Sequence, residues 1–451
     1  RCGKPVDELW TNLGPEVINI SYTGSRSIIH RVIQIDFSSI SAFLTGFSTY
    51  PQPLRLRLRI FTIFFLYKQT HQAVRKGELS TIMKLVFDKA DLVKSVGIAM
   101  KAVSGKTTMP ILECILIDAS SNVIKFTSND MELGIETIVT GMILERGIVA
   151  LDAKIFSEIV RKLPDNQVTI ETDENLVTTI TCEKAKFNIP GQSGEDFSYL
   201  PILETSDCVS ISQFTLKELI RQTIFSIAAN ENNKLMTGEL FEIKDNTLRV
   251  VSLDGHRIAI RRIELKDSYP DRKVVVPGKT LNEISKILSG EMDDQIDIYF
   301  SENHIMFKFD DTTVVSRLID GEYFRIDQML SSDYETKVTI NKKEFLSCID
   351  RATLLVKEGD KKPIIIDIQD GAMELQINSA MGSMKEEIDI NKEGKDIMIG
   401  FNPKFLIDAL RVIDDEEISI YLVNPKAPCF IRNEEESYIY LILPVNFNSV
   451  R

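Results

Sequence analysis

Two short stretches contain part of the motif that binds nucleotide phosphates. Residues 104–107 and residues 277–280 both carry the Gly-Lys-Thr triplet with which such loops hold phosphates and a magnesium ion. The complete motif needs another glycine five residues before the first of these three, and Met100 and Lys273 stand there instead. We therefore exclude a nucleoside triphosphate site at both places.

A second candidate for chemistry is the run Asp254-Gly255-His256-Arg257, which places a histidine beside an acid. No serine or cysteine nucleophile motif accompanies it, and Asp-Gly after a strand first of all predicts a turn. The other carboxylates are scattered without the pairing that a metal or glycosidase site needs. The sequence therefore favours a protein that is not an enzyme and holds no cofactor or metal.

The chemistry that does recur is cationic. Four predicted helices carry two basic residues seven positions apart, which places both on one face because seven residues make almost two turns. Two further predicted helices carry a basic pair at other spacings. In a chain of net charge −13 this pattern predicts six helices that present a weakly basic face to a polyanion, and the alternative is an ordinary solvated face. The residues are Lys94, Lys101, Lys154, Arg161, Lys217, Arg221, Lys279, Lys286, Lys343, Arg351, Lys404 and Arg411.

Each basic face needs a helix whose other side packs on a sheet, and residues 208–229 illustrate this unit. Val209 and Ile211 alternate with serines, which is the pattern of a half-buried strand. Thr215 has Glu218 three residues later, the capping-box spacing of a helix N-terminus. The apolar residues that follow at helical spacing are Leu216, Leu219, Ile220, Ile224 and Ile227. The stretch therefore predicts a strand and then an amphipathic helix.

The same unit recurs with a fixed period. Equivalent positions lie 127 and 126 residues apart in one block (Phe87, Phe214, Ile340) and 125 and 125 apart in a second block (Lys154, Lys279, Lys404). Alternating strands follow each block. This period indicates an α+β fold with three tandem repeats of a helix-plus-antiparallel-sheet domain. The expected segments are a leader over 1–82, domains over 83–204, 205–332 and 333–447, and a tail over 448–451.

The number of helices sets the size of any ring that they line. Helices packed side by side lie about 9–10 Å apart, so six would close a ring about 18 Å across with almost no hole. Twelve would give a ring of roughly 36 Å with a channel of about 26 Å, which is wide enough for a DNA duplex. The repeat therefore predicts a dimer with six domains.

Composition agrees with a globular protein of several domains. A chain of 451 residues with 43% apolar and 26% charged residues is too long for one core. Its six cysteines include no Cys-x-x-Cys pair, which fits a reducing cytoplasm. No stretch approaches the roughly 20 apolar residues of a membrane span.

Residues 1–82 differ from the remainder of the chain. They contain ten Lys and Arg against five Asp and Glu, and they begin with Arg. Residues 76–78 (Lys-Gly-Glu) can be encoded by a bacterial ribosome-binding sequence shortly before Met83. We expect a poorly ordered leader read from upstream DNA, with the natural start at Met83. The alternative is an arm that binds a membrane surface or a partner.

Six short motifs lie outside the predicted helices, five of them between helices and one near the chain end. They are MPIL (109–112), SNDMEL (128–133), DGHRIA (254–259), SRLIDGEYF (316–324), GFN (400–402) and LPV (443–445). In this order, on a threefold repeat, the chain resembles the beta subunit of bacterial DNA polymerase III, the DNA sliding clamp. The resemblance covers residues 83–447 and none of residues 1–82.

The resemblance implies a head-to-tail homodimer in which two chains close a pseudo-sixfold ring, with helices lining the hole, around duplex DNA. The ring would tether the replicative polymerase, and polymerase, clamp loader and repair proteins would bind through short apolar peptide motifs. The implied pocket residues are Met236, Leu253, His256, Arg257, Ile258, Phe324, Met329, Leu441, Leu443, Pro444 and Val445. The implied interface residues are Phe187 and Ile189 facing Leu354 and Leu355, and Lys106 matches a position near DNA.

A function of another class fits the same repeat. A repeat scaffold that binds only protein peptides would carry the basic stripes as solvated faces and would be monomeric or open. The size of the particle in solution separates the two, because a stable dimer favours the ring.

Overall fold

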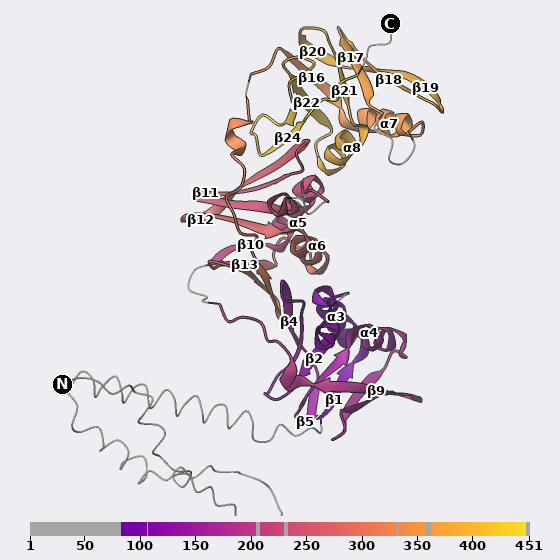
Figure 1. Cartoon of the computed structure of the whole chain (residues 1–451), viewed down its shortest axis with the longest axis vertical. Coiled ribbons are helices and arrows are strands. Elements are labelled where there is room, and N and C mark those ends of the chain that lie inside the picture. Colours follow the sequence, from indigo (N-terminus) through magenta and orange to yellow (C-terminus); the bar gives the residue numbers. More distant parts are fainter. Residues whose placement is uncertain are drawn as a thin grey trace, which may run out of the picture. The chain divides into compact units, whose positions relative to one another are not determined.

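The computed structural model describes residues 83–105, 107–203, 208–229, 233–331, 333–356 and 362–447 (Figure 1). The predictions for a leader over 1–82 and a tail over 448–451 lie outside these residues, as does Lys106. Residues 204–207 and 332, at the two expected domain joints, also lie outside them. The domain boundaries therefore stay predictions.

The described elements follow a similar order three times, except that the second repeat has two long strands between its helices where the other repeats have five shorter ones. The first repeat contains β1 (Met83–Asp88), α3 (Lys89–Ala99), β2 (Cys114–Asp118), β3 (Ile124–Asn129), β4 (Leu133–Val139), β5 (Met142–Glu145), β6 (Ile148–Asp152), α4 (Ala153–Lys162), β7 (Gln167–Thr172), β8 (Val177–Cys182) and β9 (Ala185–Ser193). The second contains β10 (Cys208–Ser212), α5 (Gln213–Thr223), β11 (Gly238–Leu253), β12 (Arg257–Pro277), α6 (Gly278–Ile287), β13 (Gln295–Phe300), β14 (His304–Phe309) and β15 (Thr312–Arg317). The third contains β16 (Thr336–Asn341), α7 (Lys342–Thr353), β17 (Ile364–Gln369), β18 (Ala372–Ser379), β19 (Gly382–Asp389), β20 (Asn391–Gly394), β21 (Ile397–Phe401), α8 (Pro403–Val412), β22 (Glu417–Leu422), β23 (Cys429–Arg432) and β24 (Tyr438–Ile442).

Helix α5 shows why these segments are helical and where the sequence prediction was wrong. Its buried residues include Leu216, Leu219 and Ile220, as the apolar spacing predicts. The cap, however, is Ser212, whose Oγ accepts a hydrogen bond from Thr215 N (3.1 Å). Thr215 itself lies inside the first turn, because the extended backbone ends three residues earlier than predicted. The α-helix also ends at Thr223 and continues only as a short 3₁₀ turn.

The strands form three antiparallel sheets, two of which pass from one repeat to the next. The largest joins the first two repeats through β4 and β15, with Ile135 opposite Val314. A seven-stranded sheet joins the second and third repeats through β12 and β24, with Ala259 opposite Tyr440. The third, of four strands, has the order β19-β18-β17-β21. Backbone hydrogen bonds therefore hold neighbouring repeats together.

Each repeat has a core of its own between its helices and its sheets. Phe126 and Phe156 belong to the first core, Phe307 to the second and Phe345 to the third, and all four side chains are buried. Burial of one such side chain stabilises the fold by about 1.5–3 kcal/mol. The helices pack in pairs, α3 with α4, α5 with α6 and α7 with α8. The pairs lie along one side of the sheets (Figure 1).

A fourth apolar cluster lies outside these three cores. It joins the strands of the second repeat to those of the third, and it includes Leu253, Ile258 and Leu441. Among the described residues no helix is long and apolar enough to cross a membrane.

Candidate nucleic-acid interface and peptide pocket

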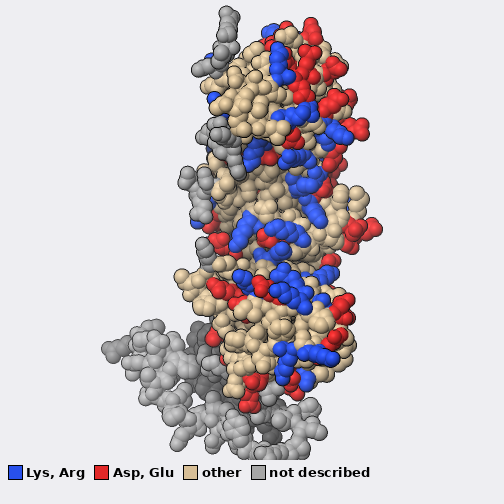
Figure 2. Space-filling view, turned by 90° about the vertical axis from the view of Figure 1, so that its right-hand side faces the viewer, with Lys and Arg blue, Asp and Glu red and all other residues tan. Residues whose placement is uncertain are grey.

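The six described helices present their polar sides on a common face. Figure 2 shows this face, on which Lys and Arg side chains form a band over the helices while Asp and Glu gather along one margin. Side-chain caps fix where several helices begin: Asp152 accepts from Ile155 N (2.7 Å), and Asn341 accepts from Glu344 N (3.0 Å). The caps therefore set which residues of each helix face outward.

Five of the predicted cations are exposed and have no ion-pair partner among the described residues. Arg161 donates through Nε to Ser157 O of its own helix (3.2 Å). The five lie on α3, α4, α7 and α8, and they are Lys94, Lys154, Arg161, Lys343 and Lys404. Their charges are open to a phosphate.

The remaining described cations have partners within the chain. Lys217 donates to Leu288 O (3.3 Å), and the others form ion pairs with carboxylates. The pairs are Lys101–Glu283 (4.0 Å), Lys279–Asp130, Lys286–Glu283 (2.7 Å), Arg221–Asp414 (2.7 Å), Arg351–Glu386 and Arg411–Asp350 (3.4 Å). Lys101 also lies beyond the end of α3, in a 3₁₀ turn. The helix face therefore holds two classes of cation, which residue spacing alone did not distinguish.

The run that begins at Asp254 forms a turn, as the sequence predicts. Asp254 Oδ1 accepts from the backbone N of His256 (3.0 Å) and of Arg257 (3.2 Å), and Gly255 has φ 86°. A φ in this region suits glycine because it has no Cβ. His256 is exposed, and its ring lies 5.9 Å from that of Phe405.

Several expected pocket residues come together in the fourth apolar cluster. Leu253, Ile258 and Leu441 belong to it, and the half-buried Met236 and Phe324 pack against it. The other expected apolar residues, Met329, Leu443, Pro444 and Val445, are not in this cluster. Of these, Leu443 is 38% exposed and hydrogen-bonds through its backbone N to His256 O (2.8 Å).

The Arg257 side chain joins the second and third repeats through its hydrogen bonds. Its Nη1 donates to Asp408 (2.7 Å), its Nη2 to Phe225 O (2.6 Å) and its Nε to Asp254 (2.9 Å). The guanidinium also lies over the Phe405 ring, 4.5 Å from the centroid. Because its donors are occupied in this way, Arg257 holds the strands that carry the cluster.

A cavity of about 510 Å³ lies beside the cluster, between the second-repeat sheet and residues 318–328. Among the expected pocket residues that the structure describes, only Phe324 lines this cavity. Its wall adds residues that sequence reasoning missed, among them Leu240, Tyr323 and Arg249. Only the alternation of apolar residues along the strand could have indicated Leu240.

Charged groups close to this cavity have shifted pKa values. The hydrogen bond from Arg249 to Asp327 (2.6 Å) lowers the pKa of Asp327. Burial raises the pKa of Glu239 to about 8. Burial, and then the neighbouring Glu239 carboxyl, raise the pKa of Tyr323. The second repeat therefore contains a buried carboxyl group, that of Glu239, which favours its neutral form.

The residues expected at a dimer interface differ in exposure. Leu354 is 75% exposed and Phe187 is 39% exposed. Ile189 belongs to the core of the first repeat, and Leu355 packs against the core of the third. Phe187 and Leu354 are thus the two that a partner chain can cover.

The family models that match this chain are those of the DNA polymerase III beta subunit. The N-terminal domain model matches residues 83–201, the central domain model 210–324 and the C-terminal domain model 327–446. The beta sliding clamp of Staphylococcus epidermidis is 33% identical over 375 residues, which are 81% of this chain and 99% of that protein.

Solved structures of the same family resemble it as well. A crystal structure from Eubacterium rectale, named as a DNA polymerase III beta subunit, is 71% identical, with a TM-score of 0.79 over 81% of this chain and 100% of that one. The DNA polymerase sliding clamp of Bacillus subtilis is 35% identical, with a TM-score of 0.78 over the same shares. These findings do not favour the peptide-binding scaffold. The chain belongs to the DNA polymerase III beta subunit family, and it is a DNA sliding clamp, a processivity factor that is not itself a catalyst.

Proposed function

We propose that two copies of this chain close head to tail into a ring that encircles duplex DNA and keeps the replicative polymerase on it. The observation that carries the proposal is the band of Lys and Arg over the helix face of a protein whose net charge is −13 (Figure 2). In a closed ring this face lines the hole. The acidic remainder repels DNA elsewhere, so binding is confined to the hole.

The DNA contacts are assigned to the exposed cations without ion-pair partners: Lys94, Lys154, Arg161, Lys343 and Lys404. Contacts from Lys and Arg to phosphates carry no sequence information, and they weaken as salt is added. The protein therefore moves along the duplex without a preferred position. Closure of the ring, rather than affinity, prevents its escape.

Ring closure requires the first repeat of one copy to meet the third repeat of the other. Phe187 and Leu354 supply exposed apolar side chains at these two places, with Ile189 and Leu355 behind them. Two copies also supply twelve helices of the kind described, and about twelve are needed for a channel of roughly 26 Å.

Partner binding is assigned to the apolar surface around Leu253, Ile258, Leu441 and Leu443. Exposed apolar side chains beside a buried cluster suit a short peptide with apolar anchors. Polymerase, clamp loader and repair proteins would compete for this surface. Because the proposed function is carried out on the bacterial chromosome, we expect the protein in the cytoplasm.

The experiment that tests the ring is retention on DNA of different topology. The full chain is loaded on a nicked circle by a clamp loader, the circle is then cut once, and bound protein is measured after gel filtration. We expect retention on the circle and loss from the linear product. The control is a linear product with a tightly bound blocking protein at each end, and this DNA should retain the clamp. Equal loss from circle and linear DNA would show that affinity, not topology, holds the protein.

A further inference from the structure

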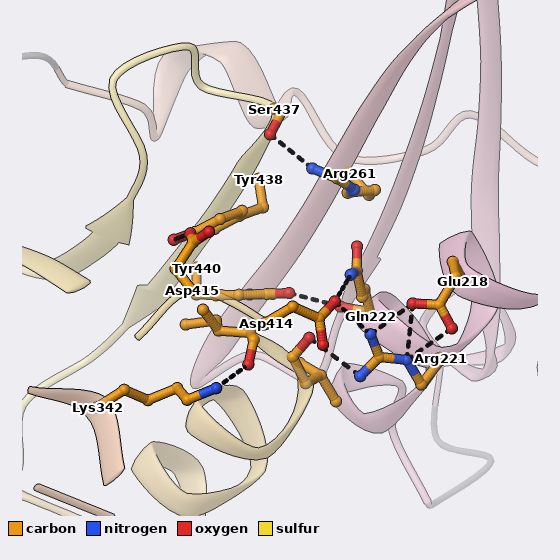
Figure 3. A network of polar contacts seen from close by, with 12 residues as sticks. Glu218, Arg221, Gln222, Arg261, Lys342, Asp414, Asp415, Ser437, Tyr438 and Tyr440 are labelled. Atoms are coloured by element: carbon orange, nitrogen blue, oxygen red, sulfur yellow. Dashed lines mark hydrogen bonds and ion pairs between the residues drawn. The ribbon is translucent and has the colours of Figure 1, made fainter. Parts of the chain in front are cut away.

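The end of α5 meets the turn after α8 through a polar network that crosses the second joint (Figure 3). Arg221 Nη1 donates to Val412 O (3.2 Å), and Arg221 Nη2 donates to Asp414 Oδ2 (2.7 Å). Within α5, the same guanidinium donates through Nε and Nη2 to Glu218 (2.9 Å from Nε). Of the five N–H groups of an arginine, these partners occupy four.

Asp414 accepts a hydrogen bond from a second side chain of α5, and further hydrogen bonds fix the backbone on both sides of this contact. Gln222 Nε2 donates to the same Oδ2 (3.2 Å), and Tyr440 Oη donates to Gln222 O (3.1 Å). On the other side, Lys342 Nζ donates to Ile413 O (2.6 Å). The carboxylate therefore occupies a defined place between two donors rather than lying free on the surface.

The first joint contains a contact of the same kind. Lys279, at the start of α6, pairs with Asp130 of the first repeat. The Asp130 side chain is only 6% exposed. At both joints, then, a cation on the helix face is paired with a carboxylate of the neighbouring repeat.

We propose that Arg221 and Gln222 form an anion site that Asp414 of the next repeat fills, so that Arg221 positions the joint instead of contacting DNA. A carboxylate and a backbone phosphate offer a guanidinium the same acceptor oxygens. A phosphate can therefore reach the Nη2 hydrogen that Asp414 accepts only by displacing this carboxylate. This inference rests on the proposed function, because it divides the cations of the helix face between the joints and the DNA.

The test compares Asp414→Asn with Asp415→Asn. Both variants remove one negative charge at adjacent positions, but Asp415 pairs with Tyr438 Oη (2.6 Å) and not with Arg221. Binding of the full chain to a fluorescein-labelled 30-base-pair duplex is measured as a function of salt. Each added phosphate contact steepens the slope of log K against log salt by about 0.9. We expect Asp414→Asn to steepen the slope by up to about this amount, and Asp415→Asn to leave it unchanged.

A double variant identifies the group that responds. Adding Arg221→Gln to Asp414→Asn should return the slope to that of the native chain. No steepening in Asp414→Asn, or a double variant as steep as Asp414→Asn alone, would overturn the proposal.

Amide hydrogen exchange reports on the joint without DNA. Exchange in the last turn of α5 should become faster in Asp414→Asn and in Arg221→Gln, but not in Asp415→Asn. Unchanged exchange in the first two variants would show that the pair does not hold the joint. A native chain that binds no duplex at any salt would refute the proposed function, whereas the exchange measurement would still decide for or against the joint.

Discussion

Glu239 offers a quantitative test of how the second repeat is built. The side chain is fully buried on β11, and neither carboxylate oxygen has a hydrogen-bond partner among the described residues. Ser226 Oγ is also buried and unpartnered. Burial without donors penalises the charged form, so the pKa of Glu239 rises from 4.5 to about 8. We predict that Glu239→Gln changes the pH dependence of stability.

The sign follows from which state holds the proton. Between pH 4.5 and 8 the folded chain keeps the Glu239 proton and the unfolded chain releases it, so stability falls as pH rises. At about 1.4 kcal/mol per pKa unit, the cost is about 1.5 kcal/mol at pH 5.5 and about 4.5 kcal/mol at pH 8.5. Gln cannot ionise. The stability of Glu239→Gln relative to the native chain should therefore rise by about 3 kcal/mol between these pH values.

The assay is urea unfolding of both proteins at several pH values, followed by far-ultraviolet circular dichroism. Comparing the two proteins at each pH cancels the titration of all other groups. Any fixed cost of burying the amide shifts the curve without changing its slope. Glu264→Gln, at an exposed position on β12, is the control and should give a pH-independent difference. A pH-independent difference for Glu239→Gln as well would refute the reasoning, because the carboxyl would then be neutral or charged in both states alike.

Two further predictions concern the pocket and the third repeat. Leu443→Ala should weaken binding of a partner peptide by about tenfold or more in a fluorescence titration, because an exposed apolar anchor is lost. Sedimentation should show the dimer intact, and unaltered peptide affinity would contradict the pocket. Gly394→Ala should lower the free energy of unfolding by about 1–3 kcal/mol more than Gly371→Ala. Both residues have positive φ, but only at Gly394 would a Cβ collide with the backbone of Glu335, and equal losses in urea unfolding would contradict this.

Local patterns were enough to predict the elements of the fold. The apolar stripe of α5 and the alternation of β10 arise from contacts within a few residues, so they are visible in the chain itself. The cap was misassigned because Ser212 and Thr215 are both good capping residues, and only the end of the extended backbone decides between them. Because the pattern recurs with a period of about 125 residues, the equivalent helices of the other repeats could be located from their spacing.

Contacts between repeats could not be predicted in this way. Arg221 and Asp414 are 193 residues apart in the chain, and Lys279 and Asp130 are 149 apart. Spacing along a helix places a cation on a face, but it does not indicate which carboxylate of another repeat will meet it. For the same reason, spacing could not indicate that Arg257, which the resemblance assigns to a peptide pocket, hydrogen-bonds to Asp408 of the third repeat.

The carboxylates at the joints give a physical reason why a clamp for DNA can be acidic. A ring that slides needs phosphate contacts that are few and weak, because every additional contact slows movement and steepens the salt dependence. The pairs Arg221–Asp414 and Lys279–Asp130 join repeats. In the proposed ring, these two cations of each chain do not contact the DNA. Exposed ion pairs contribute little stability singly, but these are supported by further hydrogen bonds and by sheets continuous across the joints. In the proposed ring, the same helices can thus keep the repeats rigidly joined and hold the duplex loosely.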